Sequence, residues 1–333
     1  MKTLLLAFPL TLAGCIQQLE PCPGTAPGPG ASVSCSMPGF VDRAFDLEVP
    51  AAWDGKSPLP LLLAFHGGGG RRESAESVSC PGGDVDHAGC LGAVAGAKGF
   101  VVVRPDGVGT RPLRNLRTWN AGGGRDGWDC TSGPACKSGS DDVGYVRALL
   151  GQVRATVPID PARIFATGIS NGGAMSHRLA CEMPETFAAI VSVGGGNQLS
   201  TLSSCAPGVA VMEVHGTEDP CWTYATSDAS CLANDGQKKL GVAETMEGWA
   251  TRNACAPTPV ERALADVDPA DGTTVRRFDW KSCRADVSLV RIEGGGHTWP
   301  GGYQYFGVDR VGRVTHDVGS DVIVEFFLAH PKP

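Results

Sequence analysis

Three side chains of this chain have the chemistry needed to activate a hydroxyl for attack on a carbonyl group. Ser170 stands at the centre of G-I-S-N-G (168–172), the G-x-S-x-G pattern that holds a serine on a tight turn between a strand and a helix. Asp219 ends the run H-G-T-E-D, and His297 follows three consecutive glycines. A neutral histidine can accept the serine proton, and a carboxylate can orient that histidine. The three residues therefore predict acyl transfer through a covalent serine intermediate.

The segments around these residues indicate how the chain brings them together. Apolar runs of strand length at 164–167, 209–214 and 287–292 each end shortly before one of the three. The carboxyl ends of parallel strands lie at one edge of a sheet, where the active sites of α/β proteins collect. Glu218 precedes Asp219 on the same loop and is the second candidate for the acid. We therefore expect serine, acid and histidine at a single sheet edge.

A glycine-rich loop follows the first long apolar run. Residues 59–65 have the length and composition of a buried strand, and H-G-G-G-G follows at 66–70. Such a loop lets a backbone N–H approach a substrate oxygen without a side chain in the way. The alternatives are a flexible turn and a dinucleotide-binding loop, but Arg72 stands where the third glycine of G-x-G-x-x-G would be. We interpret the loop as part of an oxyanion hole.

Strands and helices alternate through the middle of the chain. Further apolar runs of strand length lie at 100–103 and 187–193, and apolar residues have helical spacing over 141–157 and 318–328. Residues 40–49 alternate enough for an edge strand. This order predicts an α/β fold with a doubly wound, mostly parallel sheet and helices on both faces.

Composition limits the function classes that need considering. The 333 residues, 42% of them hydrophobic, are enough for one large catalytic domain. The net charge of −7 and the lack of long basic runs argue against a nucleic-acid surface. No C-x-x-C pair occurs, which argues against a zinc site. Serine acyl transfer needs no metal and no organic cofactor, and we expect neither. We expect a monomer.

The first residues resemble an export signal. A lysine supplies a positive start, residues 4–12 are apolar but too short to span a bilayer, and L-A-G-C ending at Cys15 resembles a bacterial lipobox. Acylation of Cys15 would anchor the protein to the cell envelope, and ordinary signal cleavage with secretion is the alternative. We divide the chain into a lipoprotein signal peptide at 1–14, a Pro/Gly-rich tether at 15–38 and a catalytic domain at 39–333.

The cysteine count also favours an exported protein. The chain has 13 cysteines, so acylation of Cys15 leaves an even number for six disulfides in an oxidising compartment. Spacing suggests local pairs: Cys22 with Cys35, Cys80 with Cys90, Cys130 with Cys136, Cys181 with Cys205, Cys221 with Cys231, and Cys255 with Cys283.

Two tryptophans are candidates for the substrate cleft. Trp119 lies in the segment 110–140, whose many glycines and predicted disulfide clip favour an ordered substrate rim over an exposed insertion. Trp299 stands two residues after His297. Aromatic faces suit a feruloyl ring, a sugar or an apolar polyester segment. We expect both indoles to contact substrate, and the alternative is that each packs its own loop.

Six stretches spread over residues 40–331 carry a family resemblance. They are H-G-G (66–68), W-N-A-G (119–122), D-D-V-G-Y-V-R-A-L (141–149), G-I-S-N-G (168–172), H-G-T-E-D-P (215–220) and G-G-G-H-T-W-P-G-G (294–302). Together they resemble the poly(3-hydroxybutyrate) depolymerase-like esterases of the α/β-hydrolase superfamily, a group similar to feruloyl and acetylxylan esterases. The order serine, acid, histidine is also that of the superfamily. The resemblance implies the α/β-hydrolase fold.

The resemblance further implies a role for each site residue. Ser170 is the nucleophile, His297 the general base, and Asp219 the acid that orients the base. The backbone N–H groups of Gly68 and Asn171 form the oxyanion hole. The implied activity is carboxylic ester hydrolysis, with hydroxycinnamoyl or acetyl esters of polysaccharide or 3-hydroxyalkanoate oligomers as substrates. The alternatives are a peptidase or acyltransferase of the same fold, or a catalytically silent surface-binding protein, which the intact residue order argues against.

Overall fold

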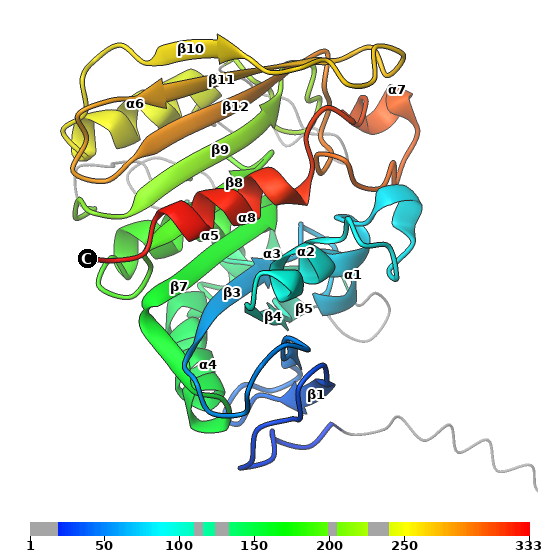
Figure 1. The fold of residues 1–333 in the computed structure, drawn as a ribbon, viewed down its shortest axis with the longest axis vertical. Coiled ribbons are helices and arrows are strands. Elements are labelled where there is room, and N and C mark those ends of the chain that lie inside the picture. The colour runs from blue at the N-terminus through cyan, green and yellow to red at the C-terminus, as the bar shows by residue number, and fades with distance from the viewer. Residues whose placement is uncertain (1–18, 110–115, 124–132, 199–204, 226–239) are drawn as a thin grey trace, which may run out of the picture.

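The computed structural model describes residues 19–109, 116–123, 133–198, 205–225 and 240–333, and all that follows concerns those residues (Figure 1). The strands are β1 (Ser32–Ser36), β2 (Ala44–Glu48), β3 (Leu59–Phe65), β4 (Val101–Pro105), β5 (Val108–Gly109), β6 (Arg117–Thr118), β7 (Ile159–Ile169), β8 (Ala189–Val193), β9 (Ala210–Gly216), β10 (Val260–Ala263), β11 (Thr274–Trp280) and β12 (Val287–Glu293). The α-helices are α1 (Arg72–Ser77), α2 (Leu91–Ala97), α3 (Pro134–Lys137), α4 (Asp142–Thr156), α5 (Asn171–Glu182), α6 (Val242–Arg252), α7 (Val308–Val311) and α8 (Ser320–Ala329).

Ten of the strands form one sheet, in the order β1-β2-β4-β3-β7-β8-β9-β12-β11-β10. The six strands from β4 to β12 in this order are parallel to their neighbours. Antiparallel strands extend the sheet at both sides, β2 and β1 beyond β4 and β11 and β10 beyond β12. The predicted doubly wound, mostly parallel sheet is thereby confirmed.

The core lies in two layers, one on each face of the sheet. Alternate residues of a strand point to opposite faces, so Leu61 and Leu63 of β3 pack with α4, α5 and α6, whereas Leu62 packs with α2 and α8. Figure 1 shows α8 and α2 on the near side of the sheet, with α5 and α6 behind its strands. Burial on both faces explains why the central strands are continuous apolar runs in the sequence.

The N-terminal side of the sheet differs from the prediction. The strand expected at 40–49 is β2, but it is not an edge, because β1 pairs with it in antiparallel register. β1 lies inside the segment 15–38 that we expected to be a tether. Its Cys35 is buried and disulfide-bonded to Cys22, which ties the strand to the segment before it, and its pairing with β2 holds it to the sheet despite the surrounding prolines. Ordered structure therefore begins upstream of the predicted domain boundary at residue 39.

Four of the six predicted disulfides are confirmed, namely Cys22–Cys35, Cys80–Cys90, Cys181–Cys205 and Cys255–Cys283. Cys136 and Cys221 are also disulfide-bonded. The partners that we predict for them, Cys130 and Cys231, lie outside the described residues, as does Cys15 with the rest of the predicted signal. The described disulfides join residues close in sequence, and Cys22, Cys35, Cys181 and Cys205 also pack in the core.

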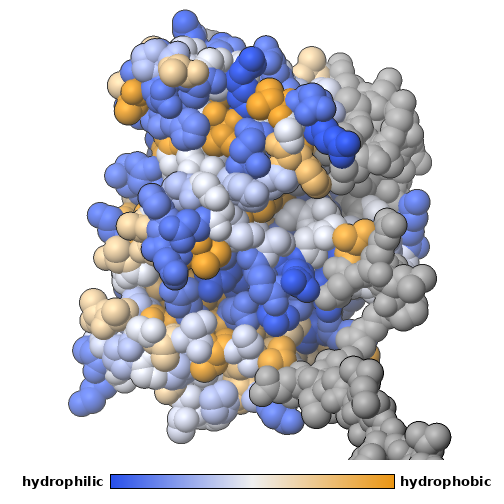
Figure 2. Space-filling model, turned by 90° about the vertical axis from the view of Figure 1, so that its right-hand side faces the viewer, coloured by the Kyte–Doolittle hydropathy of each residue, from blue (hydrophilic) through white to orange (hydrophobic). Residues whose placement is uncertain are grey.

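On the side of the molecule beside α1 and α7, the described residues that are visible form no broad apolar area. Figure 2 views the molecule from that side and shows its apolar side chains in small groups between polar ones. Among the described residues, no helix is both long enough and apolar enough to cross a membrane.

Candidate active site

Ser170 occupies the sharp turn between β7 and α5. Its backbone has φ 57° and ψ −122°, a left-handed conformation that strains a residue with a side chain and is typical of functional turns. The turn packs tightly against the end of β3. A Cβ added at Gly172 would lie 2.3 Å from the carbonyl oxygen of Phe65, and one at Gly168 would lie 2.6 Å from the same oxygen. Both glycines of the motif are therefore required by the close approach of strand and helix.

Replacing Gly172 with alanine is expected to destabilise the fold by about 3 kcal/mol or more, because backbone atoms on β3 must move to admit the methyl group. Gly151 of α4 is the matched control, since it lies exposed in a helix with no atom within 4 Å of an added Cβ. Gly151→Ala should stabilise the protein by up to ~1 kcal/mol. Urea denaturation measures both, and similar effects of the two substitutions would contradict the packing argument.

Asp219 and His297 form a buried pair at the carboxyl ends of β9 and β12. His297 Nδ1 lies 2.7 Å from Asp219 Oδ2, and the two residues are 4% and 3% exposed. The other carboxylate oxygen accepts the backbone N–H groups of Cys221 and Trp222 at 2.7 and 2.8 Å. Because the carboxylate accepts at Oδ2, the proton of His297 lies on Nδ1 and leaves Nε2 free to act as a base.

The surroundings of Asp219 keep it ionised. Burial alone would favour the neutral acid, but the electrostatic attraction of His297 and hydrogen bonds from His215 and His297 outweigh it and hold the pKa of Asp219 well below its usual range. His297 is itself fixed by its backbone: its N–H donates to Val311 at 2.5 Å and its carbonyl accepts the Tyr305 hydroxyl at 2.5 Å. The pair is therefore rigidly placed before any substrate arrives.

A second glycine run, at 194–196, was not among the predicted site residues and packs closely against them. Gly194, directly after β8, has φ 56°, and an added Cβ would lie 3.2 Å from His297 Nδ1 and 3.4 Å from Asp219 Oδ2. A Cβ at Gly195 would lie 2.3 Å from the Ser170 carbonyl oxygen. Three consecutive glycines directly after an apolar run of strand length were the sequence signal that could have pointed to this segment.

The backbone N–H groups of Gly68 and Asn171 are both free to bind an anion. Asn171 is the first residue of α5, whose first N–H groups have no partner within the helix. Within the described residues, neither N–H donates to a protein acceptor. The two residues are neighbours, since a Cβ added at Gly68 would lie 3.7 Å from the Asn171 Cβ. The helix dipole of α5 adds to the positive potential there.

His66 fixes the peptide that carries the Gly68 N–H. Its Nε2 accepts the N–H of Gly107 at 3.0 Å, and its Nδ1 lies 2.7 Å from the carbonyl oxygen of Gly67. Since a carbonyl only accepts, His66 is the neutral tautomer with its proton on Nδ1. Burial lowers the pKa of His66 to about 4, which keeps this tautomer at neutral pH. The Gly67 carbonyl is thereby held, and the Gly68 N–H of the same planar peptide points the opposite way.

Ser170 and His297 open into one pocket. Its volume is about 460 Å³, and the glycine loop 67–70 forms part of its wall. Tyr303, Tyr305 and Phe306, which the sequence reading did not assign, also line it. These aromatic residues follow the G-G-G-H-T-W-P-G-G stretch directly, so their proximity to the predicted histidine was the signal that could have identified them. Tyr303 and Phe306 are 39% and 44% exposed and therefore lie at the mouth.

The structure does not place Trp119 in the cleft. Its side chain is fully buried, packs edge-on against Phe65 and donates its indole N–H to the carbonyl of His66 at 3.0 Å. The side chain of Asn171 exchanges two hydrogen bonds with the backbone of Trp119, at 2.6 and 3.0 Å. The expectation that Trp119 contacts substrate is thus contradicted. An indole whose N–H finds an internal carbonyl is more stable buried, and here it supports the glycine loop from behind.

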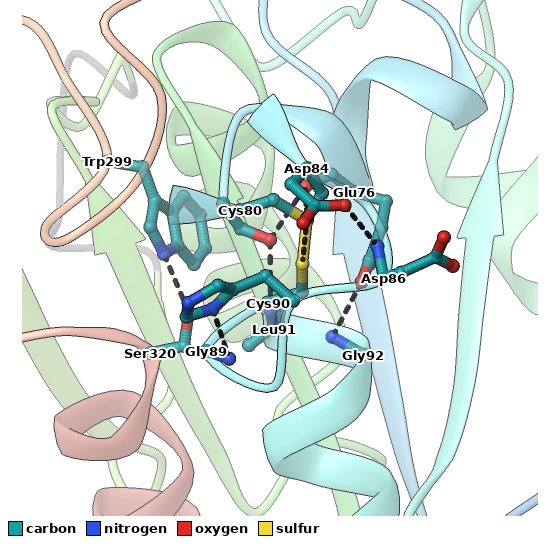
Figure 3. Close-up of a disulfide and its surroundings, with 12 residues drawn as sticks. Glu76, Cys80, Asp84, Asp86, Gly89, Cys90, Leu91, Gly92, Trp299 and Ser320 are labelled. Atoms are coloured by element: carbon teal, nitrogen blue, oxygen red, sulfur yellow. Dashed lines mark hydrogen bonds between the residues drawn. A yellow bond between two sulfur atoms is a disulfide. The ribbon is translucent and has the colours of Figure 1, made fainter. Parts of the chain in front are cut away.

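Trp299 is also a scaffold residue, contrary to expectation. It is 1% exposed and donates its indole N–H to the Ser320 hydroxyl at the start of α8 at 3.1 Å. Figure 3 shows Trp299 beside the Cys80–Cys90 disulfide, with its ring nitrogen directed at Ser320. Its apolar ring fills the space between that loop and α8, because two residues after His297 the chain has already turned into the core.

Metal-binding capacity among the described residues is limited to three groups of side chains. Two of them, Glu76 with Cys80 and Cys90, and Asp219 with Cys221 and His297, contain cysteines whose sulfurs are committed to disulfides. The third comprises Asp268, Asp271 and the exposed His316. The Asp271 carboxylate in that group already accepts hydrogen bonds from Thr273 and the backbone of His316.

Comparison with known proteins places this geometry in context. A solved acetyl xylan esterase from Aspergillus awamori matches the structure with a TM-score of 0.58 at 14% identity, covering 90% of this chain and 99% of the other. The protein has the α/β-hydrolase fold.

Sequence comparison finds esterases over most of this α/β-hydrolase chain. Feruloyl esterase C of Emericella nidulans is 28% identical over 292 residues, which are 86% of this chain and 84% of that protein. NocK of Nocardia uniformis subsp. tsuyamanensis, whose name classes it with the esterases, is 28% identical over 303 residues, 86% and 79% of the two chains. No family profile matches the chain. These relatives agree with the family resemblance found in the motifs.

Proposed function

We propose that this protein is a serine esterase that hydrolyses carboxylic esters through an acyl-enzyme. The observation that carries the proposal is the convergence of three features around one pocket: the strained turn at Ser170, the hydrogen-bonded pair of Asp219 and His297, and the unpaired N–H groups beside them. The esterases found by sequence comparison support the same reaction class.

In the proposed mechanism, His297 Nε2 takes the proton of Ser170 as its hydroxyl oxygen attacks the ester carbonyl carbon. The N–H groups of Gly68 and Asn171 stabilise the negative charge that forms on the carbonyl oxygen. His297 then gives the proton to the departing alkoxide, and an acyl-enzyme remains. A water molecule then attacks the acyl carbon while His297 takes its proton. The bond to the Ser170 oxygen breaks, the acyl group leaves as a carboxylic acid, and His297 returns the proton to the serine. Asp219 stabilises the imidazolium in both steps.

The pocket favours a hydroxycinnamoyl ester as the substrate. A volume of about 460 Å³ is far larger than an acetyl group needs, and the lining residues that the structure describes include no Asp, Glu, Lys or Arg. Leu116, Tyr303 and Phe306 offer apolar and aromatic surface at the mouth, where a feruloyl ring could stack. The relatives named feruloyl esterase point in the same direction.

This proposal is tested by comparing methyl ferulate, p-nitrophenyl acetate and 3-hydroxybutyrate oligomers as substrates of the purified protein. We expect the highest kcat/KM with methyl ferulate. Phe306→Ala should lower kcat/KM for methyl ferulate roughly tenfold, by removing a stacking surface, and should change the value for p-nitrophenyl acetate by less than about twofold. Tyr303→Phe, which keeps the ring, is the matched control and should leave both values near those of the wild type.

A result in which Phe306→Ala affects both esters equally would contradict the assignment of the acyl site. Preference for the hydroxybutyrate oligomers would reassign the substrate class without changing the mechanism. Failure to hydrolyse any ester, with the fold intact, would favour a peptidase, an acyltransferase or a surface-binding protein.

A further inference from the structure

A row of buried polar side chains continues from Asp219 away from the pocket. It comprises Glu213 and His215 on β9, His177 on α5 and Trp249 on α6, each at most 1% exposed. Glu213 and His215 are two positions apart on one strand and so project from the same face of the sheet. Burying two histidines and a carboxylate together is costly unless their charges and hydrogen bonds match, so their protonation states can be read from the contacts.

The far end of the row fixes the state of His177. The indole N–H of Trp249 can only donate, and it lies 3.0 Å from His177 Nδ1. Nδ1 must therefore be the unprotonated, accepting nitrogen of a neutral imidazole. The proton of His177 lies on Nε2, which is 3.1 Å from Glu213 Oε2. Glu213 consequently accepts a hydrogen bond on this oxygen.

The near end of the row fixes the state of His215. Its Nε2 lies 2.7 Å from the carbonyl oxygen of Trp222 and 3.3 Å from Asp219 Oδ2, and both of these are acceptors. Its Nδ1 lies 2.8 Å from Glu213 Oε1. Both ring nitrogens thus face acceptor oxygens, which an imidazolium satisfies with two N–H donors.

Charge and packing around His215 agree with a cation at this position. Burial disfavours its charge, but hydrogen bonds and attraction from Asp219 and Glu213 outweigh burial and raise the pKa of His215 to about 10. Tyr224 lies edge-on to the ring with its centroid 6.1 Å away, and Arg291, the register partner of His215 on β12, is itself paired with Glu293 at 2.6 Å. His215 is therefore a cation placed between two carboxylates.

We infer that His215 is a positioning residue that holds the Asp219 carboxylate toward His297 and offsets part of its negative charge. The inference rests on the proposed roles of Asp219 and His297. Asp219 Oδ2 is shared between His297 Nδ1 and the His215 cation, so the carboxylate cannot rotate away from the base. The cation also offsets part of the attraction that the Asp219 carboxylate exerts on a proton at His297, and removing the cation should strengthen that attraction.

The test removes the charge and keeps the hydrogen bonds. The double variant combines Glu213→Gln with His215→Gln. The amide oxygen introduced at position 213 can still accept from His177, and the amide NH₂ introduced at position 215 can still donate to the Trp222 carbonyl. We expect the acidic limb of its kcat/KM profile to move to higher pH by roughly one unit, with kcat reduced more than KM is changed. His330→Gln is the matched control, because it also breaks a histidine–carboxylate pair, at 3.0 Å from Asp286, and should leave the profile unmoved.

A second measurement observes the charge directly and needs no activity. In protein labelled with ¹⁵N-histidine, the signals lost in His215→Gln identify His215, and both of its nitrogens should have imidazolium shifts at pH ~8, well above the ordinary range of imidazole titration. A neutral His215 at this pH would overturn the inference. So would a folded double variant with an unmoved profile, or one that loses activity equally at every pH. Retained activity in Ser170→Ala would instead refute the proposed function and leave the spectroscopic result standing.

Discussion

The substitution Ser170→Ala is expected to lower kcat for ester hydrolysis by on the order of 10⁶, the size of effect that removal of a catalytic serine has in other serine hydrolases. Alanine keeps the Cβ that the turn already accommodates at φ 57°, so the backbone strain is unchanged. The free energy of unfolding should therefore stay within about 0.5 kcal/mol of the wild type. Substrate binding should persist, because the pocket walls and the glycine loop do not depend on the hydroxyl.

This prediction is checked by steady-state kinetics together with a fluorophosphonate label that reacts with activated serines. The wild type should gain one label, which peptide mass spectrometry should place on Ser170, and Ser170→Ala should gain none. Labelling at another serine, or turnover within tenfold of the wild type in a folded variant, would show that Ser170 is not the nucleophile.

The substitution Asp219→Asn should lower kcat by about 10⁴ while leaving most of the site in place. The amide oxygen can still accept the N–H groups of Cys221 and Trp222. Its NH₂ group then faces His297 Nδ1 and donates to it, which forces the ring proton onto Nε2. In that tautomer His297 cannot accept a proton from Ser170.

Glu218→Gln is the matched control for the acid, since Glu218 is adjacent in sequence and was the second candidate. Its side chain is 63% exposed and lies 3.6 Å from Arg313, away from the buried pair. Its loss should change kcat by less than about twofold. Equal losses from the two substitutions, measured with the same ester at several pH values, would contradict the assignment of Asp219 as the orienting acid.

Local sequence patterns were sufficient for most of the central fold. The apolar runs at 59–65 and 287–292 correspond to β3 and β12 almost residue for residue, because strands buried on both faces must be apolar throughout. The exposed strand β10 gave no such signal, since all four of its residues face solvent. β1 was missed because its neighbouring prolines and glycines are typical of a tether, whereas its pairing with β2 depends on a partner elsewhere in the chain.

The sequence by itself determined the chemistry of the candidate site, because a strained turn, an acid and a base each need particular residue types beside glycines and strand ends. It predicted Ser170, Asp219 and His297 as the catalytic residues, and the tertiary structure shows the last two in contact. It could not decide which side chains face the pocket. Trp119 and Trp299 have the composition of a substrate wall, but burial depends on the packing of segments distant in sequence, and the fold buries both.

The protonation state that we infer for His215 likewise depends on contacts that only the tertiary structure makes. Nothing local distinguishes His215 from any other histidine at the end of a strand. Its state depends on Glu213 two residues away, on Asp219 across the loop, and on a chain of donors through His177 to Trp249 on another helix. Hydrogen-bond direction and buried charge are properties of groups in contact, and those contacts exist only once the sheet and its helices have assembled.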